Sequence, residues 1–247
     1  MNSHLISAIV PVSLLSGWEL GSAVGAIDET TFSRPSAILR AGAIAAADGS
    51  LVTATYQTLE AASLGLFAGT LIGVTLGIFL GLQRLVELAS RPTLEMLRAI
   101  PAIAFTPLAL LIFGFGLTME STIVAYATCW PVMIATLAAT RRIEPRLLEV
   151  AATLEMTAIE RLWTIIIPAV FGRVVVGLRI AIGFALVVAV TVEILVNPRG
   201  LGYALILAQQ TFRTDLMYAL IVWLAVLGMI AGALSSQLDR LSVPRSS

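Results

Sequence analysis

The chain alternates between long apolar runs and short polar connections. A helix needs about 20 apolar residues to cross roughly 30 Å of hydrocarbon, because its backbone N–H and C=O groups must be satisfied within the helix itself. Six runs meet this length: 5–27, 61–83, 99–119, 121–140, 174–195 and 216–238. The pattern therefore predicts an all-α polytopic membrane protein, a single domain over residues 1–247 with six transmembrane helices.

Arginines are distributed unequally between the predicted loops. Cytoplasmic loops of membrane proteins are enriched in basic residues, so this distribution indicates an orientation. With the N-terminus inside, ten arginines are cytoplasmic: Arg84, Arg91, Arg98, Arg141, Arg142, Arg146, Arg161, Arg173, Arg240 and Arg245. Four are external, namely Arg34, Arg40, Arg199 and Arg213, and Arg179 lies within the fifth span. We expect both termini to be cytoplasmic.

The external segment 28–56 is too polar to cross a membrane. Within it, Arg34, Pro35 and Ser36 precede an apolar stretch. This order predicts a short interfacial helix for which Ser33 or Ser36 is a candidate cap. A plain surface loop is the alternative.

The second span carries a glycine at every fourth position: Gly65, Gly69, Gly73, Gly77 and Gly81. Residues four apart lie on one face of a helix, and glycines there let a neighbouring backbone approach closely. We expect this face, called the glycine ladder, to pack against another span. Direct lining of a substrate path is the alternative.

Composition narrows the classes of function. Hydrophobic residues make up 58% of the chain and charged residues 12%, which is typical of a protein in a bilayer. All 15 basic residues are arginine, so the chain lacks the P-loop lysine that contacts the β- and γ-phosphates of ATP. A net charge of zero gives no field that attracts nucleic acid. Cys129 and His4 are each the only residue of their type, so no disulfide or metal cluster is expected.

One long polar segment, 141–172, separates the fourth and fifth spans. Pro145 suits the first position of a helix, and apolar residues recur after it at helical spacing. Thr157 and Glu160 form a T-x-x-E capping box that begins a second helix. We therefore predict helix, turn, helix for this hairpin segment, with the turn near Glu155. An amphipathic hairpin that rests on the membrane surface is the alternative.

The hairpin segment resembles the EAA motif of ABC importer permeases. Glu149-Val150-Ala151, Glu155 and Ile165 to Pro168 match the spacing E-A-A, three residues, G, nine residues, I-x-L-P. In that family the motif forms a coupling helix that sits in a groove of the ATPase subunit. The resemblance implies this role for Glu149, Val150, Ala151, Ala152, Leu154, Glu155, Met156 and Thr157.

Two residues depart from the motif. Val150 replaces an alanine, which is a small steric change. Glu155 replaces a glycine, and a left-handed backbone at that position costs a non-glycine residue roughly 1 to 2 kcal/mol. The turn is therefore expected to differ in shape from the family's, or Glu155 contacts a basic residue of the ATPase.

Further stretches in the same order are similar to the permeases of nitrate, sulfonate, taurine and related importers. They are Trp18-Glu19-Leu20, Arg34-Pro35-Ser36-Ala37-Ile38-Leu39, Leu97-Arg98-Ala99-Ile100-Pro101, Thr106-Pro107-Leu108, Gly177-Leu178-Arg179-Ile180-Ala181, Gly200-Leu201-Gly202 and Phe212-Arg213-Thr214-Asp215. The resemblance implies a type I importer permease fold in a bacterial inner membrane. It also implies a second permease copy, a dimer of ATPase subunits that holds ATP and Mg, and an extracytoplasmic solute-binding protein.

The same resemblance implies that this chain is a transport subunit without a cofactor, not an enzyme. Its expected cargo is a small solute that moves from periplasm to cytoplasm, such as a sulfonate, nitrate or an aromatic acid, and the residues do not identify it. A secondary transporter or channel that works without an ATPase is the rival function. A non-transporting scaffold is the third.

Ionisable residues and prolines inside the spans indicate a substrate path. Charged groups are expensive in hydrocarbon and usually face a water-filled space. Pro101, Pro107 and Pro131 free backbone carbonyls that such a space can satisfy. The candidates are Arg98, Phe105, Thr106, Trp130, Met133, Arg179 and Glu193. Ordinary packing, and anchoring of helix ends by the two arginines, are the alternatives.

Overall fold

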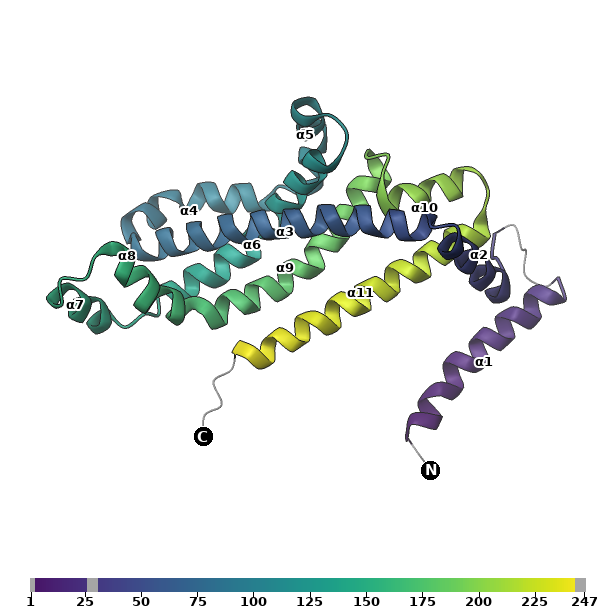
Figure 1. Cartoon of the computed structure of the whole chain (residues 1–247), viewed down its shortest axis with the longest axis horizontal. Coiled ribbons are helices and arrows are strands. Elements are labelled where there is room, and N and C mark those ends of the chain that lie inside the picture. The colour runs from purple at the N-terminus through teal and green to yellow at the C-terminus, as the bar shows by residue number, and fades with distance from the viewer. Residues whose placement is uncertain (1–2, 26–30, 243–247) are drawn as a thin grey trace. The chain divides into compact units, whose positions relative to one another are not determined.

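The computed structural model describes residues 3–25 and 31–242, and every regular element among them is helical (Figure 1). The helices are α1 (Ser3–Ala23), α2 (Pro35–Ala47), α3 (Ser50–Leu82), α4 (Arg84–Ala99), α5 (Thr106–Phe113), α6 (Leu117–Thr140), α7 (Pro145–Thr153), α8 (Ala158–Arg161), α9 (Ile167–Leu195), α10 (Gly200–Gln210) and α11 (Thr214–Ser242). A 3₁₀ turn, Ala102–Phe105, precedes α5, and a π-helical turn, Leu162–Ile166, joins α8 to α9. Residues 26–30 and Arg245, and the side chains of His4 and Arg240, lie outside the described part.

Two compact units divide the chain. One contains Met1–Thr58 and Arg199–Leu227, and the other contains Leu59–Pro198 and Gly228–Ser247. Four helices within the described ranges are long and apolar enough to cross a membrane: Ser50–Leu82, Leu117–Thr140, Ala158–Leu195 and Thr214–Gln237. The bent pair of α4 and α5 counts as a fifth if it is one span.

In the first unit, α10 begins against side chains of α3. The first N–H groups of a helix have no partner within it. Gly200 and Leu201 donate theirs to Gln57 Oε1 and Thr58 Oγ1, both at 2.9 Å. Because Thr58 and Leu201 are fully buried, these bonds fix the start of α10 on α3.

The short helix expected after Arg34 is present as α2, but the expected caps were wrong. Arg34 occupies the N-cap position without a side-chain bond. Glu19 of α1 caps the helix instead, accepting hydrogen bonds from the N–H of Ser36 at 3.1 Å and from its hydroxyl at 2.7 Å. A carboxylate suits this place because the N-terminus of a helix carries partial positive charge. Glu19 therefore has a structural role in this unit.

In the second unit, the glycine ladder packs against α6, as predicted. A Cβ added at Gly73 would lie 2.6 Å from the carbonyl oxygen of Cys129, and one at Gly77 would lie 2.6 Å from Cβ of Thr136. The other three glycines approach α6 as closely. The facing threonine Thr128 is buried, and its hydroxyl also reaches the carbonyl of Gly65 at 3.3 Å. Close backbone contact between α3 and α6 therefore depends on these glycines.

The predicted third span, 99–119, is not one straight helix. The chain bends by 85° between α4 and the segment Ala102–Phe113 (Figure 1). Pro101 has no N–H to continue α4, which explains the break. A second break follows at Gly114 and Gly116, whose φ angles of 69° and 124° favour glycine.

The fifth span begins earlier than predicted. It was expected to begin at residue 174, yet α8, the π-helical turn and α9 form one 38-residue helix, Ala158–Leu195. A π-helical turn shifts the hydrogen-bond register, so the missing N–H of Pro168 is tolerated. The hairpin segment is consequently joined to the fifth span without a flexible connection.

A buried polar cluster closes the end of α9. Asn197 Nδ2 donates to Glu120 Oε2 at 2.6 Å, and the N–H of Gly116 donates to Asn197 Oδ1 at 3.1 Å. Both side chains are at most 2% exposed. The cluster holds the glycine turn before α6 against the C-terminal end of α9.

Candidate functional site

The hairpin segment folds as predicted, with α7 and α8 together at one end of the second unit (Figure 1). Pro145 stands in the first turn of α7. Glu155 follows α7 with a φ of 52°, in the left-handed region. Its N–H donates to the carbonyl of Ala152, and that of Met156 donates to Ala151, both at 3.0 Å. This is the Schellman arrangement that usually places glycine where Glu155 stands.

The capping box starts the second helix. The N–H of Thr157 donates to Glu160 Oε2 at 2.8 Å, and Thr157 Oγ1 accepts from the N–H of Glu160 at 3.3 Å. Two otherwise unpaired backbone donors are thereby satisfied within four residues. The turn is therefore defined by backbone–backbone hydrogen bonds after α7 and by bonds between backbone and side chains before α8.

Replacing Glu155 with glycine should stabilise this turn. Glycine removes a left-handed penalty of roughly 1 to 2 kcal/mol but loses more backbone entropy on folding, so a net gain of about 1 kcal/mol is expected. Hydrogen-exchange mass spectrometry should show about fivefold slower exchange at the amides of residues 155 and 156. Glu155→Ala keeps the penalty and should show no gain. If the glycine and alanine variants exchanged at the same rates, the left-handed backbone at residue 155 would not be strained.

Several large apolar side chains of the hairpin segment are exposed. Val150, Leu154, Ile159 and Trp163 are between 54% and 70% exposed. Glu149, Ala152, Glu155 and Thr157 are exposed as well, and Met156 is half-buried. Exposed apolar patches of this kind mark surfaces that bind a partner.

Other residues of the segment face inward. Ala151 is fully buried, so of the predicted coupling residues it acts within the hairpin and not on its surface. Ile143, Ile166 and Val170 form a buried cluster with Ala139 at the end of α6, and Leu148 packs on it. This cluster packs the hairpin segment against the ends of α6 and α9.

The bend after α4 borders a hollow of about 470 Å³, called the first hollow. Tyr126 of α6 fixes the bend: its hydroxyl donates to the carbonyl of Leu97, the group that a continued helix would have paired with the N–H that Pro101 lacks. Phe105 packs on the Tyr126 ring with centroids 4.6 Å apart, and Trp130 meets it edge-on at 5.6 Å.

Some predicted path residues lie at this place and others do not. Arg98 and Trp130 line both the first hollow and a second one of about 210 Å³, which Met133 also lines. Phe105 lies beside them, and Thr106 is buried at the start of α5. Arg179, exposed on α9, and Glu193, buried on the same helix, are not among the lining residues.

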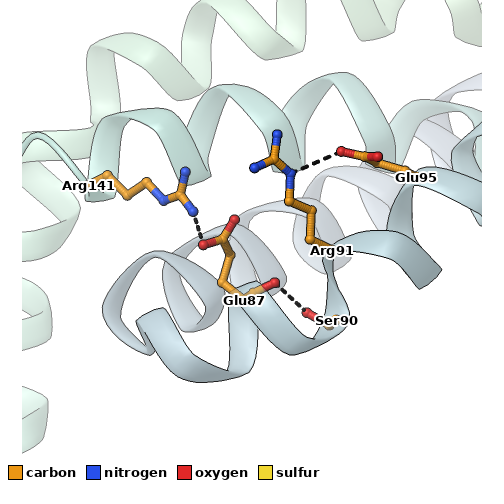
Figure 2. A network of polar contacts seen from close by, with 5 residues as sticks. All are labelled: Glu87, Ser90, Arg91, Glu95 and Arg141. Carbon is orange, nitrogen blue, oxygen red and sulfur yellow. Dashed lines mark hydrogen bonds and ion pairs between the residues drawn. The ribbon is translucent and has the colours of Figure 1, made fainter.

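A third hollow, of about 510 Å³, connects α4 to the hairpin segment and contains a charge network that the sequence did not reveal (Figure 2). Buried Glu87 forms an ion pair with Arg141, the first residue of the hairpin segment. Arg91 pairs with Glu95 at 3.0 Å. Glu87 and Arg141 are 54 positions apart, so no local signal links them. The contact between Tyr126 and Trp130, in contrast, could have been predicted from the sequence, because residues four apart share a helix face.

Comparisons with known proteins agree with this architecture. The chain is 28% identical over 232 residues to the putative aliphatic sulfonates transport permease of Bacillus subtilis, covering 94% of this chain and 84% of that protein. It is 29% identical over 191 residues to the taurine transport system permease of Escherichia coli, covering 76% and 70%. Its fold matches a chain of the MetNI methionine ABC transporter in an inward-facing conformation with a TM-score of 0.66 at 18% identity, over 78% of this chain and 96% of that one.

The family model for binding-protein-dependent transport system inner membrane components matches residues 69–246. The matched region contains α6, α9, the hollows beside α4 and the whole hairpin segment. The chain therefore belongs to this family: it is the membrane-spanning permease of an ABC-type importer, a non-enzymatic subunit whose ATPase is a separate polypeptide.

Proposed function

We propose that the hairpin segment is the surface through which the ATPase drives this permease. The observation that carries the proposal is the exposed apolar patch of Val150, Leu154, Ile159 and Trp163 on a hairpin with a hydrogen-bonded turn. Because the hairpin is rigid and continues into α9, a movement of the bound ATPase would move α9 with it. Glu149, Ala152, Met156 and Thr157 surround the contact, Ala151 maintains the hairpin, and ATP with Mg is held by the partner.

A charge placed in the apolar patch should release the ATPase. Leu154→Arg adds a cation at a 69% exposed position without filling a buried site. We expect the amount of ATPase that co-purifies with the permease to fall by more than about tenfold, because burial of a central apolar residue dominates such contacts. Ile44→Arg, the same change at an exposed isoleucine of α2, is the control and should retain the ATPase. Stoichiometric ATPase with the Leu154 variant would overturn the proposed contact.

The wider assembly follows from the same proposal. Two permease copies, an ATPase dimer and an extracytoplasmic solute-binding protein form the importer, and all 247 residues of this chain form one membrane domain with six spans. The arginine distribution supports cytoplasmic termini, which place the hairpin segment on the ATPase side. In this arrangement α1 overlaps the predicted first span, 5–27. The bent pair of α4 and α5 takes the place of the predicted third span.

The proposed cargo is a small anion such as a sulfonate, nitrate or an aromatic acid. Arg98 at the first and second hollows supports this, because a guanidinium fork suits a planar or tetrahedral anion. Met133, Phe105 and Thr106 complete the surroundings of the path. Arg179 and Glu193 are proposed to act further along it. Relatives named for sulfonates and taurine are consistent with an anionic cargo.

A further inference from the structure

The charged side of α4 borders the hollows, and of its five charged residues only Glu87 is buried. Arg84, Glu87, Arg91, Glu95 and Arg98 follow one another at intervals of three or four residues, so they share one face of the helix. All five line the second or third hollow, and Figure 2 shows the side chains of Glu87 and Arg91 extending from α4, that of Glu87 toward Arg141 just after α6.

The apolar side of α4 faces outward. Leu85 and Met96, which lie away from the charged face, are 83% and 71% exposed. A helix of a soluble protein has the opposite arrangement. In a membrane protein, an exposed charged face opposite an exposed apolar face indicates that the charged side borders water and the apolar side lipid.

The three hollows follow one another along this face. Arg98 and Trp130 line both the first and the second. Glu87, Arg91 and Arg141 line both the second and the third, which reaches Pro145 of α7. Shared lining residues make them a series that runs from the bend after α4 to the hairpin segment.

The series is positively charged. Arg84, Arg91, Arg98 and Arg141 face two carboxylates, and the carboxylates of Glu87 and Glu95 are each paired with one of these arginines. Arg84 and Arg98, at the two ends, make no ion pair with any residue that the structure describes. The arginines of α4 are seven residues apart, which corresponds to about 10 Å along the helix.

We propose that the charged face of α4 is the release route for the transported anion. Arg98 receives the anion at the first hollow, Arg91 and Arg141 pass it on, and Arg84 stands at the exit. Glu95 and Glu87 compete for the two middle arginines, which keeps each contact weak enough for the anion to leave. The proposal rests on the proposed import of an anion and assigns residues and a direction to it.

Charge-selective labelling tests the route without knowledge of the cargo. In a permease with Cys129→Ala, Leu94→Cys places one thiol at the second hollow. The permease is kept in its complex with the ATPase, and two reagents are compared: the anion 2-sulfonatoethyl methanethiosulfonate and the cation 2-(trimethylammonium)ethyl methanethiosulfonate. Relative to their rates with a free thiol, the anion should react about tenfold faster than the cation, because the three arginines and two glutamates of the second hollow give it a net positive charge.

Matched variants identify the source of the preference. Arg91→Gln with Arg98→Gln should bring the ratio close to one, whereas Arg173→Gln, a change at an exposed arginine outside the hollows, should leave it unchanged. Met96→Cys, on the apolar side of α4, should show no anion preference. Ile134→Cys, which lines the first and second hollows, is a second reporter in case the first one perturbs α4.

Three results would overturn the route: equal rates for both reagents, a faster cation, or no reaction at either reporter. ATPase content is measured in the same samples. A complex that retains its ATPase but lacks the preference contradicts the release route and leaves the proposed coupling intact. A complex that loses its ATPase but keeps the anion preference contradicts the proposed coupling and leaves the release route intact.

Discussion

A Gly73→Leu permease is expected to lose its folded state in the membrane. The new Cβ would lie 2.6 Å from the carbonyl oxygen of Cys129 and 3.0 Å from the N–H nitrogen of Met133. Both are backbone atoms of α6, so no side-chain rotation relieves the clash. Separating α3 from α6 forfeits the packing that holds helices together in lipid, and we expect a loss of about 3 kcal/mol in the free energy of unfolding.

The midpoint of SDS-induced unfolding measures this loss. Gly228→Leu in α11 is the matched control, because a Cβ at Gly228 has no atom within 4 Å. The control should unfold at the wild-type midpoint, and Gly73→Leu well below it. If the two variants unfold together, the glycine ladder does not hold α3 on α6.

Removal of Arg141 is expected to have the next largest effect. Glu87 is 4% exposed, and its ion pair with Arg141 joins the start of α4 to the start of the hairpin segment (Figure 2). Arg141→Ala leaves a buried carboxylate without its cation. Loss of one partner from a fully buried pair costs about 3 to 5 kcal/mol, and the half-exposed side chain of Arg141 reduces the expected loss to about 2 kcal/mol.

A double-mutant cycle separates this pair from general effects. Glu87→Gln with Arg141→Ala should be more stable than Arg141→Ala alone, since no charge is then stranded. Arg142→Ala, the same change at the neighbouring exposed arginine, should stay near wild type. Additive losses in the cycle would show that the two residues do not interact.

Local sequence signals predicted the hairpin segment well. Pro145 marks the start of α7, and Thr157 with Glu160 forms the capping box of α8, because each of these signals acts within one helical turn. Glu155 was recognised as one of the two residues at which this chain departs from the family motif, and as the larger departure. The structure adds that its backbone is left-handed, as a glycine's would be.

Features that depend on contacts between residues far apart in the sequence were harder to predict. The interval of four in the glycine ladder identified a packing face but not α6 as the helix it packs on. α4 was missed because its charges interrupt the apolar pattern, and those charges make sense only beside α6. The 85° bend after α4 and the bond from Tyr126 to Leu97 likewise required the fold.

The residues predicted to line a substrate path divide in the same way. Arg98, Trp130 and Met133 were predicted from rules on charge and proline in membranes, and they do meet at the hollows. Arg179 and Glu193 satisfied the same rules without joining them. A rule for single residues cannot tell which side of a helix faces the path, since that depends on the neighbouring helices.

The central claim is that this chain transports only when a separate ATPase drives it. The most direct measurement is uptake into proteoliposomes that contain the permease with or without its ATPase, with the solute-binding protein loaded with radiolabelled taurine or nitrate as the probe outside and ATP with Mg inside. We predict accumulation against the gradient of whichever probe the binding protein holds, only with the ATPase and ATP, and abolished by Leu154→Arg. Uptake by the permease alone, unaffected by ATP, would contradict the account.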